Sequence, residues 1–198
     1  MTGNPDLELK WRIVRRLFHC LLSIVVIYYW FPDIIIQPNI GKWVLLLIGG
    51  LIVLAIEVPR LLLGKQLPWG RPYELRRPAS YAYASFGAIL VLLFTPPVIG
   101  APCIVAMAFA DPIAGELRHL GVSGMKAGIA TAISYGTISY AVMSQLTYMG
   151  FGGLILVILF AVIATISEQI DIGQIDDDFL MLVLPATAGM LIWELTIF

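Results

Sequence analysis

The stretch that decides the fold is Trp43–Leu63, WVLLLIGGLIVLAIEVPRLLL, in which the two charged residues, Glu57 and Arg60, come only near the end. A transmembrane helix needs about 20 predominantly apolar residues. The run has that length, and Pro59 falls in its last turn. The sequence therefore predicts a membrane-spanning helix here, with a carboxylate and a guanidinium at one end of it.

The composition of the whole chain agrees with this interpretation. The 198 residues are 60% hydrophobic and only 13% charged, whereas soluble domains carry about 25% charged residues. This excludes a soluble domain, a disordered chain, a secreted disulfide scaffold and a coiled coil. The net charge of −1 predicts no nucleic-acid partner. Cys20 and Cys103 lie inside apolar stretches and form no metal-binding or redox spacing.

Six further apolar runs predict an all-α, polytopic integral membrane bundle of about seven transmembrane helices in one domain over residues 1–198. The spans are expected near residues 17–36, 43–63, 79–96, 98–118, 127–148, 153–170 and 179–198, after a polar tail of residues 1–16. The positively charged start is too long for a signal peptide, and no small-residue cleavage site follows it.

The charged residues predict the orientation. Of the 12 Lys and Arg residues, all but Lys42 lie in the tail, in the loop after the second span or in the loop after the fourth. Cytoplasmic loops carry the excess of Lys and Arg, so the N-terminus is expected in the cytoplasm. Most acids fall on the same side, which orientation rules do not require. A polar catalytic or transport site at the cytoplasmic membrane face is the natural explanation.

The first candidate motif is Arg12-x-x-Arg15-Arg16-x-x-His19, at the entrance of the first span. Its helical spacing lets several of these side chains share a face, and paired guanidiniums can clamp phosphate oxygens. The alternative is a plain topology anchor. His19 lies within the apolar run, where a polar residue usually faces the bundle interior.

The second motif is Glu57-Val58-Pro59-Arg60. The two charged residues are three positions apart, so they could form an ion pair that offsets the cost of an acid in the membrane. A structural role and a functional role both stay open for this pair.

The third motif, Phe109–Arg118, begins where the fourth span nears its end and contains Asp111 and Glu116. Gly121, Gly124 and Lys126 follow it. Aspartate suits a divalent metal, glycines allow close approach to phosphate, and a lysine can hold a phosphate. The alternative is an ordinary helix end with a glycine-rich connection.

The fourth motif is acidic: Glu168-x-x-Asp171, then Asp176-Asp177-Asp178 directly before the last span. Three successive aspartates repel one another unless a cation or arginine cluster lies near them. Magnesium held by one or two carboxylates and nucleotide phosphates is a common arrangement. A solvated acidic loop is the alternative.

Together, the order of these motifs resembles the CTP-dependent lipid kinases: dolichol kinase, phytol kinase and the CTP-dependent diacylglycerol kinases. The resemblance covers nearly the whole chain. It rests on Arg15-Arg16-x-x-His19, Glu57-x-x-Arg60, Ala110-Asp111-Pro-x-Ala114 with Lys126, and Glu168 with Asp176–Asp178 and Pro185. Asp178 stands where the family usually has Asn, Ala127 where it has Ser or Thr, and Arg118 where it often has Gly.

The resemblance implies transfer of the terminal phosphate of a nucleoside triphosphate, CTP in this family, to a polyprenol-, dolichol- or diacylglycerol-like lipid, with Mg²⁺. Asp111, Lys126 and Glu168 are the expected catalytic residues. The phosphates are expected to bind the cationic side chains Arg15, Arg16, His19, Arg60 and Arg118. Metal ligands are expected among Asp111, Asp176, Asp177 and Asp178.

Two alternatives stay open. A phosphatidate cytidylyltransferase-like enzyme would use related substrates, but its Asp-Arg-x-Asp, Lys-Asp and His-Gly-Gly motifs do not occur in the sequence. A small transporter would also contain acids and broken helices in the membrane. Association into a homo-oligomer is open as well, with Gly124-x-x-x-Gly128 as its weak indication.

Overall fold

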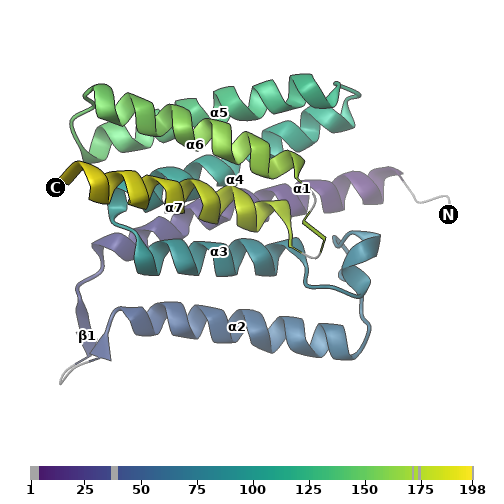
Figure 1. Cartoon of the computed structure of the whole chain (residues 1–198). Helices are drawn as coiled ribbons and strands as arrows, with labels where there is room; N and C mark the ends of the chain where they lie inside the picture. Colours follow the sequence, from purple (N-terminus) through teal and green to yellow (C-terminus); the bar gives the residue numbers. More distant parts are fainter. Residues whose placement is uncertain (1–4, 37–39, 171, 174, 198) are drawn as a thin grey trace.

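The computed structural model describes residues 5–36, 40–170, 172–173 and 175–197, and its long helices run side by side in alternating directions (Figure 1). The first helix, α1 (Pro5–Leu22), continues as a 3-10 helix, η1 (Ser23–Trp30). The other long helices are α2 (Trp43–Leu62), α3 (Ser80–Phe94), α4 (Pro97–His119), α5 (Gly124–Leu146), α6 (Phe151–Gln169) and α7 (Asp177–Ile197). The predicted all-helical class is confirmed.

Two small features interrupt the helical pattern. The strands β1 (Ile34–Ile36) and β2 (Ile40–Gly41) pair antiparallel between η1 and α2. A short 3-10 helix, η2 (Pro72–Leu75), lies in the loop between α2 and α3. Both features lie at the ends of the long helices and leave the bundle itself helical (Figure 1).

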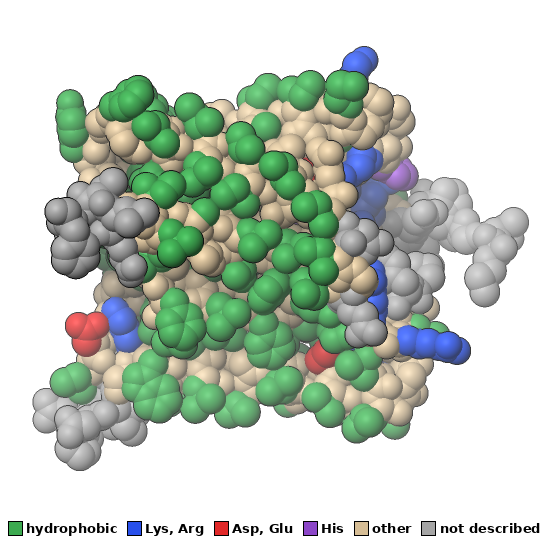
Figure 2. Space-filling model, in the orientation of Figure 1, with side chains coloured by type: hydrophobic (Ala, Val, Ile, Leu, Met, Phe, Trp, Pro, Cys, Tyr) green, Lys and Arg blue, Asp and Glu red, His purple; other side chains and the backbone are tan. Residues whose placement is uncertain are grey.

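Within the described residues, four helical segments are long and apolar enough to cross a membrane: Leu9–Trp30, Trp43–Leu62, Pro97–His119 and Phe151–Gln169. The helix α3 is apolar but shorter. On the face in Figure 2, hydrophobic side chains spread over the middle, and most Lys and Arg side chains gather at the edge nearer the N-terminus. These features support the prediction of a membrane protein.

The predicted spans and the observed helices differ most at the first one. Residues 5–16, predicted as a tail, already belong to α1, and the helical segment ends at Trp30 and not at residue 36. The early part of α1 mixes charged and apolar residues, so its mean hydropathy is low and does not identify it as part of the helix. Phe31 has extended backbone before Pro32, which explains the earlier end.

The helix α4 forms the centre of the bundle. Many of its small side chains are fully buried, among them Ala101, Cys103, Ala106 and Ala110. Small residues let neighbouring helices approach closely in a membrane protein. The buried Tyr135 hydroxyl on α5 donates a hydrogen bond towards the carbonyl oxygens of Cys103 on α4 and Met181 on α7, at 3.2 and 3.0 Å. These contacts tie α4 to α5 and α7 in the interior of the bundle.

The helix α2 lies at the edge of the bundle beside α3 (Figure 1). Large apolar side chains such as Leu47, Leu51 and Ile52 are exposed on it. An exposed apolar face on a long apolar helix is what a lipid-facing helix presents. Its inner face and the neighbouring helices border the apolar pockets described below.

Candidate functional site

A polar cavity of about 290 Å³ lies between α1, the second half of α4 and the start of α7. The residues around it come from these helices and from the loop before η2: Arg15, Arg16, His19, Arg71, Asp111, Pro112, Gly115, Arg118 and Asp177. Six of them were expected site residues from the sequence. The fold therefore brings parts of the first, third and fourth motifs together around one cavity.

His19 connects the cavity to two aspartates. Its Nε2 lies 2.9 Å from Asp178 Oδ2 and 3.6 Å from Asp111 Oδ2. Its Nδ1 lies 3.1 Å from the carbonyl oxygen of Arg15, which can only accept. Since both ring nitrogens face acceptors, the doubly protonated imidazolium satisfies every contact. His19 thus links α1, α4 and α7 by charge as well as by hydrogen bonds.

Asp176, Asp177 and Asp178 form an acidic cluster at the start of α7. One oxygen from each carboxylate lies within 4.8 Å of the others. Asp176 and Asp178 are buried. Burial and the nearby charge of Asp178 raise the pKa of Asp176 above its ordinary value. A cation among the three groups would remove this repulsion.

The donor set of this cluster fits Mg²⁺. The ion prefers oxygen ligands and is often held by one or two carboxylates together with substrate phosphates. Asp176 is fixed by hydrogen bonds from the Ser80 hydroxyl at 3.3 Å and from the Asp178 backbone N–H at 3.3 Å. Asp177 lines the polar cavity and so connects the cluster to it.

Two of the cavity arginines are oriented by carboxylates outside the cavity. Arg16 Nε donates to Glu116, and Arg118 donates to Glu168. The side chain of Glu168 is fully buried, and its second oxygen has no hydrogen-bond partner among the described residues. Glu168, predicted as catalytic, does not line the cavity and instead positions Arg118.

Gly115 makes room for the Arg16 guanidinium. A Cβ on Gly115 would lie only 2.7 Å from Arg16 Nη1, so a larger residue would push the guanidinium aside. This explains why a glycine stands between Asp111 and Arg118 on α4. The glycines of the third motif thus include one with a demonstrable steric role.

Arg60 does not lie at the polar cavity, contrary to the prediction that it binds phosphate. Its guanidinium donates to both oxygens of Glu57 at 2.8 and 2.7 Å. It also donates to the carbonyl oxygens of Lys65, Glu74 and Arg77. Glu57 accepts further bonds from the Ala79 N–H and the Tyr81 hydroxyl, both at 2.7 Å. The pair therefore anchors the loop between α2 and α3, and these contacts favour the structural role of this motif.

Lys126 is also not brought to the cavity. Its side chain is exposed on the first turn of α5, and it is absent from the residues that line the polar cavity. The glycine-rich connection before it, with Gly121 at φ +80°, ends the preceding helix and turns the chain. Asp171, the second acid of the fourth motif, lies outside the described residues.

The structure adds Arg71, which the sequence analysis did not single out. Arg71 directly precedes η2 and lines the polar cavity together with residues of the helices. Its backbone N–H donates to Glu74 at 3.0 Å, and Glu74 in turn accepts from the Ser80 hydroxyl at 3.1 Å. In the sequence, the one feature that points to Arg71 as a site residue is its place in a loop of Gly, Pro and charged residues. Several other basic residues lie in the same loop, so this feature does not single it out.

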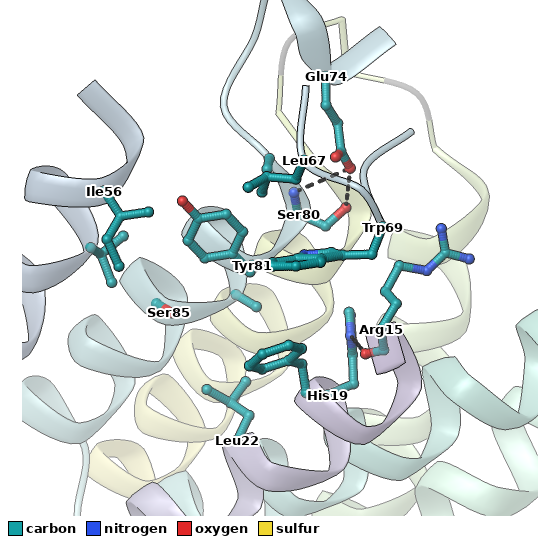
Figure 3. A pocket seen from close by; sticks show the side chains of 14 residues that line it. Arg15, His19, Leu22, Ile56, Leu67, Trp69, Glu74, Ser80, Tyr81 and Ser85 are labelled. Carbon is teal, nitrogen blue, oxygen red and sulfur yellow. Dashed lines mark hydrogen bonds between the residues drawn. The ribbon is translucent and has the colours of Figure 1, made fainter. Parts of the chain in front are cut away.

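A second cavity, mainly apolar and of about 490 Å³, adjoins the polar one (Figure 3). Arg15 and His19 line both cavities. In Figure 3, Ile56 and Leu22 lie on the left of this pocket, away from Arg15, and the ring of Trp69 lies near Arg15 and His19. Trp69 packs against Phe18 with ring centroids 5.7 Å apart. A charged site and an apolar pocket thus share one wall.

Comparison of the chain with protein-family models, with curated proteins and with solved structures gives no match.

Proposed function

We propose that this protein is a membrane-embedded lipid kinase that transfers the terminal phosphate of a nucleoside triphosphate to the hydroxyl of a lipid. The observation that carries the proposal is the shared wall of Arg15 and His19 between a cavity rich in arginine and aspartate and an apolar pocket. A nucleoside triphosphate fits the first cavity by charge. A lipid fits the second by hydrophobicity. CTP is the donor that the sequence resemblance implies.

The arginines supply the charge that a triphosphate requires. Arg15, Arg16, Arg71 and Arg118 surround one cavity. A guanidinium presents several donors in a planar fork that matches phosphate oxygens. Phosphoryl transfer depends mainly on positioning and electrostatic stabilisation, so a small helical bundle without a nucleotide-binding domain can supply what the reaction needs.

Asp111 is the group proposed to act on the acceptor. It lies beside His19, which lines both cavities. In the proposed reaction the lipid hydroxyl oxygen bonds to the terminal phosphorus as the bond from that phosphorus to the bridging oxygen breaks. The nucleoside diphosphate leaves with the bridging oxygen, and the hydroxyl proton passes to the Asp111 carboxylate. His19 holds Asp111 and Asp178 in place during this step.

Asp176, Asp177 and Asp178 are proposed to hold Mg²⁺. The ion would offset the negative charge of the phosphates. The chain's own contribution is to hold the carboxylates close together, with Asp177 at the cavity and Asp176 fixed by Ser80.

We also infer that all seven long helical elements cross the membrane and that the site faces the cytoplasm. The support is the alternating direction of the helices, with the two termini at opposite ends of the bundle, and the basic residues gathered at the end that carries the polar cavity (Figures 1 and 2). The excess of Lys and Arg on cytoplasmic loops gives the orientation.

The direct test uses purified protein in lipid nanodiscs with CTP labelled on either the γ- or the α-phosphate, and with ATP in parallel. The kinase proposal expects γ-label on a lipid product, with loss of the product in EDTA and recovery with Mg²⁺. A lipid that carries the α-label would instead show cytidylyl transfer. If neither label reaches lipid from either nucleotide, across a panel of lipid alcohols and phosphatidate, the kinase proposal is wrong and transport becomes the leading alternative.

A further inference from the structure

A third cavity continues the apolar pocket away from the polar site. It has a volume of about 480 Å³ and shares Leu22, Val53 and Ser85 with the apolar pocket. One of these residues comes from each of the three helices α1, α2 and α3. The two cavities are therefore successive parts of one hollow bordered by the same helices.

The residues along this hollow follow helical spacing on each side. On α2 they are Ile56, Val53, Gly49 and Leu46, so one face of the helix borders the whole hollow. On α3 they run from Tyr81 through Ser85 and Ala88 to Leu92. On each helix the lining residues stay on one face from the first cavity to the second, so the two cavities form one continuous groove. We call it the apolar groove.

The length of the apolar groove follows from the part of α3 that lines it. From Ser80 to Leu92 an α-helix advances about 18 Å at 1.5 Å per residue. One end is the shared wall of Arg15 and His19. The other end reaches Tyr28 and Phe31, close to the hairpin at the opposite side of the bundle. The apolar groove thus leads from the proposed reaction site through more than half of a hydrocarbon layer about 30 Å thick.

We propose that the apolar groove holds the hydrocarbon chain of the acceptor, and that the acceptor is a lipid alcohol with a single long chain. This inference rests on the proposed kinase function. The two cavities lie end to end between the same helices, so together they have room for one hydrocarbon chain along their length. The two chains of a diacyl lipid would need two such grooves side by side. The hydroxyl then lies at His19 and Asp111, and a chain longer than the groove continues into the bilayer past Phe31.

Gly49 offers a way to fill the groove without disturbing the fold. It lines the third cavity, and a Cβ built on it meets nothing within 4 Å. A Leu at this position therefore enters open space, and it also favours the helix over glycine. Gly152 on α6 gives a matched control, because it is exposed on another helix and its Cβ also meets nothing.

The experiment compares the wild type, Gly49→Leu and Gly152→Leu with three acceptors: a prenyl alcohol of about ten isoprene units, one of about two units, and a diacylglycerol. For Gly49→Leu we expect kcat/KM for the long alcohol to fall by about tenfold or more, because the chain loses apolar burial along the groove. The short alcohol, which reaches only the pocket beside His19, should change by less than about twofold. Gly152→Leu should match the wild type with every acceptor.

Two results would overturn the groove: equal losses for the long and short alcohols, or a wild type that prefers diacylglycerol. A second readout needs no turnover. A long-chain alcohol with a diazirine in the part of the chain that would lie beside Gly49 should crosslink to α2 or α3 in the wild type and lose this crosslink in Gly49→Leu. If no lipid is phosphorylated but the crosslink behaves in this way, the kinase proposal fails and the groove stands. If the crosslink is unchanged in Gly49→Leu, the groove assignment is wrong.

Discussion

His19 on α1 and Asp178 at the start of α7 are hydrogen-bonded, Nε2 to Oδ2 at 2.9 Å, although 159 positions separate them in the chain. The bond joins the basic motif at the start of the protein to the acidic motif before its last helix. It places groups that suit phosphate next to groups that suit a divalent cation.

The aspartate cluster predicts different effects for two neighbouring substitutions. Asp178→Asn keeps an oxygen that can accept from His19 and bind a cation, so activity should stay within about threefold. Asp177→Asn removes a charged carboxylate at the cavity and should lower activity by about 100-fold, since loss of even an outer-shell partner of a metal ligand costs about 10–100-fold. Initial rates at several Mg²⁺ concentrations measure both. Equal losses in the two variants would contradict the greater need for a charged carboxylate at Asp177.

The contact between Gly115 and Arg16 predicts a defect in nucleotide binding. In Gly115→Ala the new methyl group displaces the Arg16 guanidinium. Because hydrogen bonds to charged groups contribute about 1.5–3 kcal/mol, the KM for the nucleotide should rise by about tenfold or more, with kcat changed by less than about twofold. Gly124→Ala is the control, since its Cβ meets nothing within 4 Å. An unchanged KM in Gly115→Ala would show that Arg16 does not bind the nucleotide.

The pair of Glu57 and Arg60 predicts an effect on stability. Both side chains are buried, and removal of one partner leaves the other charge uncompensated. Arg60→Met should therefore lower the free energy of unfolding by about 3–5 kcal/mol. Thermal unfolding of the detergent-solubilised protein measures this, with the exposed Arg76→Met as control. Similar midpoints for the two variants would contradict the anchoring role of Arg60.

The positions of Lys126 and Arg71 reverse the expectation from the motifs. Lys126→Gln should leave kcat/KM within about twofold, because the side chain is exposed and away from the cavity. Arg71→Gln should raise the nucleotide KM by about tenfold through the loss of a charged hydrogen bond at the cavity. Steady-state kinetics on both variants show whether Lys126 or Arg71 binds the nucleotide. A larger defect in Lys126→Gln than in Arg71→Gln would restore the motif-based assignment.

The sequence was sufficient for the helical membrane class and for most helix positions, because long apolar runs have few alternatives in a chain so poor in charge. It also indicated which motifs meet, since the basic motif, Asp111 and the acidic motif all fall on the same side of the predicted spans. The start of the first helix, at Pro5 and not near residue 17, could not be predicted from hydropathy because its early turns mix charged and apolar residues.

The differences between the roles expected from the motifs and the observed contacts have a common physical cause. A basic residue in a motif can bind a substrate or a protein group, and sequence spacing does not distinguish the two. Arg60 uses its donors on Glu57 and three carbonyl oxygens, and Glu168 serves Arg118. Arg71 reaches the cavity only through the path of a loop, which no periodicity encodes.

The most direct test of the central claim is transfer of γ-phosphate from labelled CTP to a lipid alcohol by the wild type and by Asp111→Asn, with Asp33→Asn as control. Asp33 lies at the opposite end of the bundle with an exposed side chain. The account predicts labelled lipid phosphate from the wild type and the control. It predicts a loss of about 100-fold or more in Asp111→Asn, as expected for a group that takes the proton. Full activity in Asp111→Asn, or no labelled lipid from the wild type, would contradict it.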